Sequence, residues 1–326
     1  MALSNMQVYN EQIRLRTIEL LGQSTDKFNT ASGGAIVLEL GKFSGNYSRQ
    51  SFYSSLAGAQ RRVVRTNANS SQSATALAES EVVGVKVAGG FGPVIFEPSQ
   101  LTWLASQPEE AINAIAAGFA DALLADQLNT VVGCGVAAVE NQAALVNDVS
   151  ALTGGAGALT QTALNGSHAK FGDMSGQLVA DVMTGAAYHK LLEKGLQNGE
   201  RLFESSNVTV QSILGKLFVV SDIPALTETG TPNKTKVLSL CDRGLIVDGA
   251  SDIVTNLDTT NGNRRIDTTW QADYSFGTKV KGYAWDIANG GASPEDTALF
   301  TGGNWDLAVA STKHTAGTLC VADIAQ

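Results

Sequence analysis

Charged residues are scarce in this chain. They make up 16% of its 326 residues, whereas about a quarter is usual in soluble proteins, and 44% of the residues are hydrophobic. A monomer with so little charge is poorly protected against association. Subunits that bury much of their surface against copies of themselves avoid this problem, because large obligate interfaces resemble a domain core cut in half. The composition therefore favours a multimer.

Cysteine and basic residues are also in short supply. Cys134, Cys241 and Cys320 lie far apart and form no C-x-x-C pair, so neither a zinc ribbon nor a redox pair is indicated, and we expect reduced thiols. Lysine and arginine together number 22 against 31 acidic residues, which gives a net charge of −9. This balance argues against tight, non-specific binding of nucleic acid, which needs basic side chains to neutralise phosphates.

Targeting and membrane-spanning signals are absent as well. Residues 1–6 contain no basic region followed by an apolar run, so we expect no signal peptide. The longest weakly polar run, residues 111–139, is interrupted by asparagine, aspartate and glutamine, so we expect it not to span a membrane.

The sequence lacks catalytic motifs. G-x-S-x-G, H-E-x-x-H and the phosphate-binding G-x-x-x-x-G-K-[ST] do not occur. Residues 133–138 fit G-x-G-x-x-A, but they end a predicted helix instead of linking a strand to one, so dinucleotide binding is not indicated. His168, His189 and His314 are too scattered to suggest a ligand set. We therefore predict no catalytic residue, no cofactor and no metal.

The first 45 residues predict a helix and a strand. Apolar residues recur at helical spacing over residues 9–21, and Gly22 is expected to end this helix. Ile36, Leu38 and Leu40 alternate with more polar neighbours, which is typical of a half-buried strand. Residues 47–56 are aromatic but irregular.

A long two-stranded arm is predicted next. Arg61–Arg65 reads as an exposed strand, residues 66–75 are small and polar, and Val82–Val87 reads as the returning strand. An isolated hairpin of this composition is not stable alone, so we expect it to lie on a neighbour. The candidate contact residues are Arg61, Arg62, Arg65 and Lys86. The arginines either keep an exposed strand from aggregating or pair with acidic residues of another subunit.

A long helix is predicted over residues 109–140. Ser106–Glu109 has capping-box spacing, with Pro108 in the first turn. At 1.5 Å per residue this helix would be roughly 48 Å long, well beyond the average for globular domains.

The middle of the chain predicts a mixed block. Residues 143–167 are rich in small residues and are expected to form a loosely structured crossing. Residues 174–248 then predict two helices (around 178–183 and 188–196) and two strands (212–223, ended by Pro224, and 236–241), with an apolar stretch resuming at 244–247.

The C-terminal part predicts mainly strands. Asn261–Gly262 is a hairpin signal, and the apolar residues of 270–276 alternate with polar ones. A further strand is expected over 279–285, a short helix from Ser293–Asp296 through Phe300, and final strands over 305–309 and 318–321.

This order of elements resembles the major capsid proteins of tailed bacteriophages, which have the Hong Kong 97-type fold. The stretches Asp26–Ile36 and Ser51–Tyr53 look like the major capsid subfamily of some long-tailed phages. The resemblance implies an α+β fold with an N-terminal arm, an extended β-hairpin loop, a peripheral domain with a long spine helix, and an axial domain. The expected bounds are 1–45 for the N-terminal arm and first strand, 46–98 for the extended loop, 99–142 with 249–326 for the peripheral domain, and 143–248 for the axial domain.

The same resemblance implies a structural subunit of an icosahedral head. Such subunits self-assemble into hexamers and pentamers that enclose double-stranded DNA without sequence-specific binding and without a membrane. The implied location is the virion capsid, assembled in the host cytoplasm, and the implied partners are portal, separate scaffolding and cement proteins. No fused scaffolding segment is expected, and none of Lys86, Lys279 and Lys281 is singled out as a crosslinking lysine. Two alternatives stay open: an encapsulin-like compartment around a protein cargo, and an oligomeric enzyme with an unrecognised site.

Overall fold

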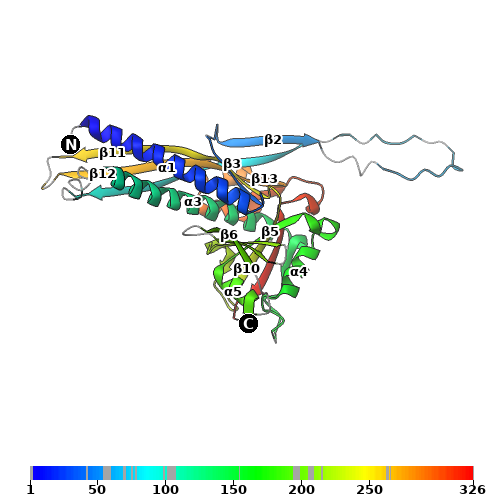
Figure 1. The fold of residues 1–326 in the computed structure, drawn as a ribbon. Coiled ribbons are helices and arrows are strands. Elements are labelled where there is room, and N and C mark those ends of the chain that lie inside the picture. Colours follow the sequence, from blue (N-terminus) through cyan, green and yellow to red (C-terminus); the bar gives the residue numbers. More distant parts are fainter. Residues whose placement is uncertain are drawn as a thin grey trace.

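The computed structural model describes residues 3–325 apart from a few short stretches. The residues left out within that range are 42, 54–59, 69–70, 75, 78, 98–99, 101–107, 154, 194–198, 205–208, 214–215, 262–263 and 265. Figure 1 shows an elongated sheet beside two long helices, a second sheet with shorter helices below it, and an arm that projects from one end. This mixture of helices and sheets agrees with the predicted α+β class.

The elongated part is built on a five-stranded sheet in the order β1–β11–β12–β3–β2. Its strands are β1 (Ile36–Glu39), β2 (Tyr47–Tyr53), β3 (Glu79–Phe96), β11 (Leu245–Thr260) and β12 (Asp267–Val280). Strands β11 and β12 pair antiparallel from Leu245↔Val280 to Thr260↔Asp267. This pairing confirms the hairpin predicted around residue 261.

The alternation predicted for β12 is observed. Trp270, Ala272 and Phe276 are buried, whereas Gln271 and Asp273 are exposed. The buried side chains face the two long helices: the Trp270 ring lies edge-on to Phe119, at 5.4 Å between centroids. One face of the five-stranded sheet therefore forms a core with the helices, and the opposite face is exposed.

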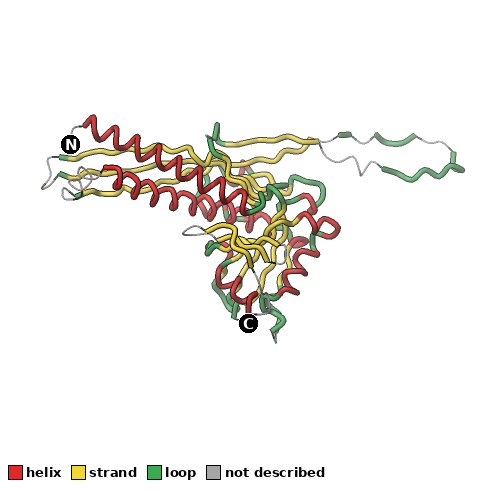
Figure 2. The backbone as a smooth tube through the Cα atoms, viewed as in Figure 1, coloured by secondary structure: helices red, strands yellow, loops and turns green. Residues whose placement is uncertain are grey.

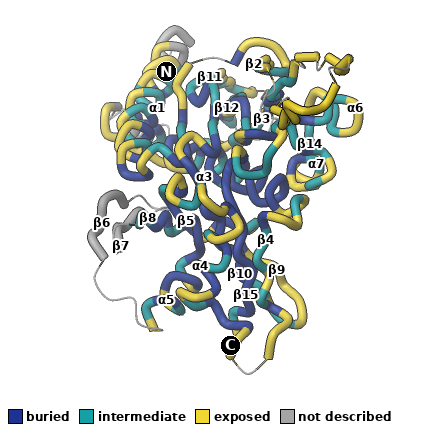
Figure 3. Tube along the Cα trace, turned by 90° about the vertical axis from the view of Figure 1, so that its right-hand side faces the viewer, coloured by how far each residue is buried: buried dark blue, intermediate teal, exposed yellow. Residues whose placement is uncertain are grey.

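The predicted long helix is confirmed as α3 (Pro108–Glu140). Its first half alternates between buried and exposed positions, but residues 130–139 are buried on every side, as the dark central segment of Figure 3 shows. Gly135 explains this change, because a Cβ there would lie 2.8 Å from Leu245 and 3.2 Å from Leu238. Leu245 begins a strand of the first sheet and Leu238 belongs to the second, so α3 ends where the two sheets meet.

The N-terminal helix is longer than predicted. Helix α1 spans Leu3–Ala31 and passes through Gly22 without interruption, so the predicted end at Gly22 is wrong. A glycine inside a helix costs only about 1 kcal/mol, and Thr25 and Phe28 continue the buried stripe of Leu21 beyond it. Residues with positive φ follow the helix end, at Gly33 (62°) and Gly34 (76°).

The second sheet has eight strands. The order is β4–β15–β10–β5–β8–β7–β6, with β9 paired to β10. The strands are β4 (Val146–Asp148), β5 (Leu178–Met183), β6 (Gly199–Glu204), β7 (Thr209–Ile213), β8 (Lys216–Val220), β9 (Thr227–Glu228), β10 (Lys234–Cys241) and β15 (Gly317–Asp323). Helices α4 (Gln161–Ala169) and α5 (Gly185–Glu193) lie beside it in Figure 1. Strand β15 joins this sheet although the elements just before it in sequence do not.

Two predictions for this region are wrong. Residues 178–183 form the interior strand β5 instead of a helix. The strand is buried on both faces, so its apolar residues lack the period that separates strand from helix. Residues 143–167 were expected to be loosely structured. They include β4 and most of α4, whose N-terminus is capped by the Thr160 hydroxyl accepting from the backbone N–H of Ala163.

Other predictions in the block hold with altered bounds. Helix α5 and strand β10 match the predictions over 188–196 and 236–241, although 194–196 lie outside the described residues. The strand predicted over 212–223 is split, because β7 and β8 pair antiparallel on either side of residues 214–215. After β10 the chain crosses from the second sheet to the first through Arg243, which has a φ of 52°.

The C-terminal region completes the fold with short elements. These are β13 (Tyr283–Trp285), α6 (Ile287–Gly290), α7 (Asp296–Leu299) and β14 (Trp305–Leu307), with β13 paired to β14. Gly282, with a φ of 81°, turns the chain between β12 and β13, so the single strand predicted over 279–285 is divided. Short 3-10 helices span Ala143–Leu145, Gly172–Gln177, Pro224–Leu226, Gly302–Asn304 and Thr312–His314.

Candidate functional site: the arm and its base

The projecting arm differs from the predicted hairpin in its pairing. Strand β2 pairs with β3 from Tyr47↔Val85 to Tyr53↔Glu79. Arg61–Arg65, predicted as a strand, has no regular secondary structure, and Figure 2 draws the described part of the arm beyond β2 as loop. Residues 61–65 pair with no described strand, so among the described residues they lack the partner that a strand requires.

The structure places the three arginines together and Lys86 apart from them. Arg61, Arg62 and Arg65 are exposed, and none forms an ion pair with any part of the chain that the structure describes. Lys86 lies in β3, within the body of the sheet, where its Nζ is 4.0 Å from Asp252 Oδ2. That carboxylate also accepts a hydrogen bond from Ser275 Oγ at 2.8 Å. Lys86 therefore has an acidic partner in its own subunit, whereas the arginines have none among the described residues.

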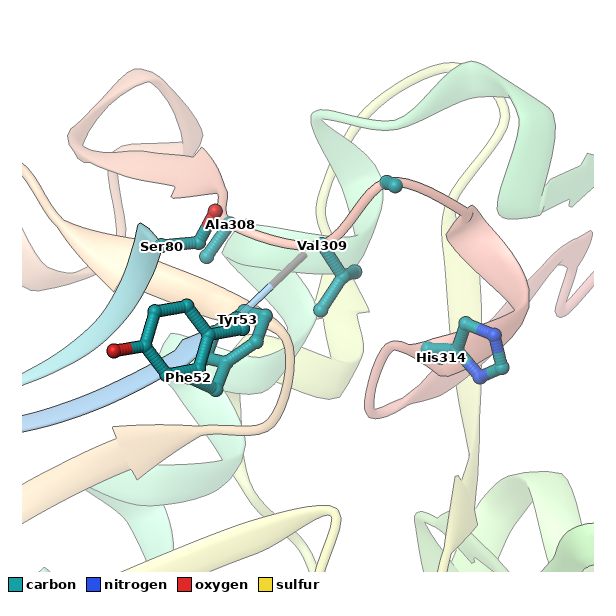
Figure 4. Close-up of a pocket in the computed structure, with 7 residues that line it drawn as sticks. Phe52, Tyr53, Ser80, Ala308, Val309 and His314 are labelled. Atoms are coloured by element: carbon teal, nitrogen blue, oxygen red, sulfur yellow. The ribbon is translucent and has the colours of Figure 1, made fainter. Parts of the chain in front are cut away.

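A pocket of about 470 Å³ lies at the base of the arm. Figure 4 shows Phe52 and Tyr53 from β2 on one side and Val309 and His314 on the other. Its remaining lining residues are Ser80, Ala308 and Ala310. Tyr53 is 69% exposed, which is unusual for an aromatic side chain in a folded subunit. The pocket presents apolar surface but no cluster of converging charged groups.

A network of four charges lies where the two sheets meet. Glu39 and Asp248 are opposite each other in the parallel pairing of β1 with β11. Arg243 donates a hydrogen bond to Glu39 at 2.6 Å, and Lys279 forms an ion pair with Asp248. The hydrogen bond from Arg243 holds the pKa of Glu39 below its ordinary value. The network joins β1, β11, β12 and the turn after β10.

A second charged contact links α3 to the eight-stranded sheet. Lys236 on β10 is only 8% exposed, and its Nζ lies 2.9 and 2.8 Å from the two carboxylate oxygens of Glu140, the last residue of α3. Glu228 lies 3.3 Å away on the other side. The long helix is thereby tied to both sheets.

One cluster has the residue types of a hydrolase but not its geometry. His168 Nε2 lies 3.0 Å from Asp181 Oδ1 and 3.1 Å from Ser239 Oγ. In a catalytic triad the carboxylate and the nucleophile contact different ring nitrogens, so that the base is oriented by one and acts through the other. Here a single nitrogen serves both, and Asp181 and Ser239 are buried. The cluster is a structural contact between α4 and the sheet.

The described residues offer no candidate metal site, and the one long apolar helix lies in the core. The described residues contain no group of three or more histidine, cysteine or acidic side chains placed to hold a metal. Residues Ile112–Glu140 of α3 are long and apolar enough to cross a membrane, but 78% of the most apolar window is buried inside the protein. The apolar character of α3 is thus accounted for by its place in the core.

Several of these contacts were not predicted from the sequence. The partners in the Glu39–Arg243, Lys236–Glu140 and His168–Asp181 contacts stand 204, 96 and 13 residues apart. No local motif marks such pairs, because only the tertiary fold brings them together. The basic cluster of the arm was found because its three arginines are neighbours in sequence.

The chain was compared with known families, curated proteins and solved structures. The sequence model of the Gp13-like family, described as major capsid protein 13-like, matches residues 5–319. No curated protein matches. Among solved structures, the head of Helicobacter pylori bacteriophage KHP40 has 9% identity and a TM-score of 0.48, covering 89% of this chain and 87% of that one. Mycobacterium phage Ogopogo has 11% identity and a TM-score of 0.46, with 74% and 86% covered. The cyanophage Pam1 capsid has 10% identity and a TM-score of 0.44, with 73% and 81% covered.

Proposed function

This chain belongs to the Gp13-like family of major capsid proteins, and it is therefore a non-enzymatic structural subunit of a phage capsid. We propose that it forms hexamers and pentamers of an icosahedral head around double-stranded DNA. The family match over residues 5–319 is the observation that carries this proposal. The encapsulin-like compartment and the enzyme receive no support from the comparisons.

In this proposal the two sheets have different tasks. The eight-stranded sheet with α4 and α5 is the axial region, which meets its copies around each hexamer or pentamer. The five-stranded sheet with α1 and α3 is the peripheral region, which meets neighbours between these rings. The pairing of β15 with β10 supports counting residues 317–323 with the axial region as well as 143–248.

The arm is the part that reaches a neighbour. It projects away from its own subunit (Figure 1), and its three arginines have no ionic partner among the described residues. Charge-assisted bonds to carboxylates of an adjacent subunit would satisfy them. Each such bond is weak when exposed, but it recurs at every subunit of a closed shell, so the sum is large.

The remaining partners follow from the same role. We place assembly in the host cytoplasm, with portal, separate scaffolding and cement proteins as partners. The net charge of −9 supports enclosure of DNA without tight binding, because the wall offers few cations to the phosphates.

Reversing the charge of the arm tests this function. Arg61, Arg62 and Arg65 are changed together to glutamate, and the yield of shells is measured by size exclusion and electron microscopy. We expect a strong loss of shells while the circular dichroism and melting of the subunit stay unchanged, because the arm makes few contacts within its own chain. The matched control changes the same residues to lysine, which keeps the charge and is expected to keep assembly. Normal shell yield from the glutamate variant would refute the role given to the arm.

A further inference from the structure

Strand β3 is longer than the strand that covers its outer side. β2 pairs with β3 only over Glu79–Val85, and Lys86 N–H donates to Asn46 C=O just beyond. On its other side β3 pairs with β12 from Val85 to Phe96. No other described strand pairs with the outer side of β3 between Ala88 and Phe96. Among the described residues, this half of β3 is therefore an open sheet edge.

The composition of the edge makes it accessible. Ala88, Gly89 and Gly90 are small, and Pro93 lacks the N–H that a ladder needs, so the pairing stretch is Ala88–Phe91. Gly90 stands opposite Asp273 in the register with β12, and a Cβ at Gly90 would lie 3.3 Å from Asp273 Oδ1. Asp273 Oδ1 accepts a hydrogen bond from Gln271 Nε2 at 3.1 Å, and because no Cβ stands at Gly90, the exposed carboxylate can still be approached from the edge.

The same chain contains a strand-forming segment without a partner. Residues 61–65 read Arg-Arg-Val-Val-Arg, and β-branched valine favours strands. Val63 and Val64 are 65% and 60% exposed, and the segment pairs with no described strand. In Figure 1 the open half of β3 runs toward the end of the sheet where β11 and β12 turn, and the arm extends in the opposite direction. The arm of a subunit thus points away from its own open edge.

The unpaired segment and the unpaired sheet edge are also complementary in charge. If residues 61–65 are extended, Arg61, Val63 and Arg65 share one face. On the helix-free face of the sheet, the strand beside β3 carries Asp273, and Ala88 and Gly90 leave the space between them clear. An arginine at the edge reaches across a glycine to this carboxylate, where the bond is charge-assisted.

We propose that Arg61–Arg65 of one subunit adds as a strand to the open edge Ala88–Phe91 of β3 in a neighbouring subunit, with an arginine bound to Asp273. The inference rests on the proposed function, since it needs an assembled shell, and it specifies the partner of the arm. It also explains why residues 61–65 carry a strand pattern but form no strand in the single subunit.

Engineered cysteines test the contact directly. A variant with Val63→Cys and Ala88→Cys is assembled, confirmed as shells by electron microscopy, oxidised, and run on a non-reducing gel. We expect loss of the monomer band to a ladder of linked subunits, because a disulfide forms only between Cα atoms within about 7 Å. The control pairs Val63→Cys with Val254→Cys, which is 69% exposed on β11, two strands in from this edge and so beyond the reach of a disulfide, and should stay monomeric. The native thiols are buried and do not interfere.

Hydrogen exchange on the unmodified protein gives a second readout. Peptides covering 61–65 and 88–91 should exchange about tenfold or more slowly in shells than in free subunits, because ladder amides exchange only by opening. The proposal would be overturned if the gel showed linked subunits for the Val254→Cys control and none for the Ala88→Cys variant. It would also be overturned if both peptides exchanged as fast in shells as in free subunits. If the native chain forms no shells either alone or together with a scaffolding protein, the proposed function itself fails, and this outcome is distinguished before any oxidation.

Discussion

The contact between Lys236 and Glu140 leads to an asymmetric prediction for stability. Lys236 is 8% exposed, whereas the Glu140 and Glu228 side chains are 43% and 48% exposed. Removal of the carboxylate and removal of the cation should therefore differ in cost. Glu140→Ala leaves a buried ammonium with Glu228 alone, but Lys236→Met leaves a carboxylate that water reaches.

The magnitudes follow from this difference in exposure. Loss of a hydrogen-bonded partner by a buried charge costs about 2–3 kcal/mol. Exposed ion pairs contribute about 0–1 kcal/mol, so we expect Lys236→Met to cost no more than about 1 kcal/mol. With an unfolding entropy of about 2 cal/mol/K per residue, 1 kcal/mol corresponds to about 1.5 °C in a chain of 326 residues. The predicted losses in Tm are about 3–4 °C for Glu140→Ala and at most about 1.5 °C for Lys236→Met.

Denaturant unfolding and calorimetry of unassembled subunits measure both variants and the double variant. The double variant should resemble Lys236→Met, because without the lysine the carboxylate has no buried partner to lose. Glu11→Ala, which breaks an exposed pair with Arg14 on α1, is the control and should leave the midpoint unchanged. Equal costs for the two single variants, or a larger cost for Lys236→Met, would refute the reasoning from burial.

Three further predictions concern other parts of the fold. Burial raises the pKa of Asp126, which accepts a hydrogen bond from Tyr274 at 2.7 Å. The contribution of Asp126 to the free energy of unfolding is therefore favourable at low pH and is lost as pH rises through the folded pKa. Asp126→Asn should raise the urea midpoint at pH 7. The variant should also gain less stability on acidification than the native protein does, and an unchanged pH profile of stability would contradict this. His168→Ala leaves the Asp181 carboxylate buried without its histidine and should cost about 2 kcal/mol in unfolding free energy, whereas the exposed His189→Ala should cost nothing measurable; equal midpoints would count against the contact. A Cβ at Gly317 would lie 1.8 Å from the backbone oxygen of Ser239, but one at Gly133 would meet the 40% exposed ring of Phe300, so Gly317→Ala should abolish soluble expression and Gly133→Ala should not.

The sequence predicted elements with a strong period and missed those without one. α3 and β12 were found because their apolar residues repeat at helical and strand spacing over many residues. β5 was mistaken for a helix because it is buried on both faces, and α1 was cut short because a glycine inside it was read as an end. α4 was missed because its small residues carry little hydrophobic signal; the Thr160 cap and the packing against β15 hold it in place.

The candidate site was predictable only where its residues are neighbours in the chain. Arg61, Arg62 and Arg65 stand out locally, and their exposure agrees with a role between subunits. The Glu39, Arg243, Asp248 and Lys279 network depends on the parallel pairing of β1 with β11. That pairing joins segments more than two hundred residues apart, and no local pattern specifies it.

The central claim is that this chain builds a closed shell in which the arm lies on another subunit. Cryo-electron microscopy of the purified chain, expressed alone and with a candidate scaffolding protein, tests it most directly. We predict closed icosahedral particles made of hexamers and pentamers, with density for residues 61–65 beside β3 of a neighbour. A chain that stays monomeric or dimeric in both preparations, or particles in which each arm folds onto its own subunit, would contradict the account.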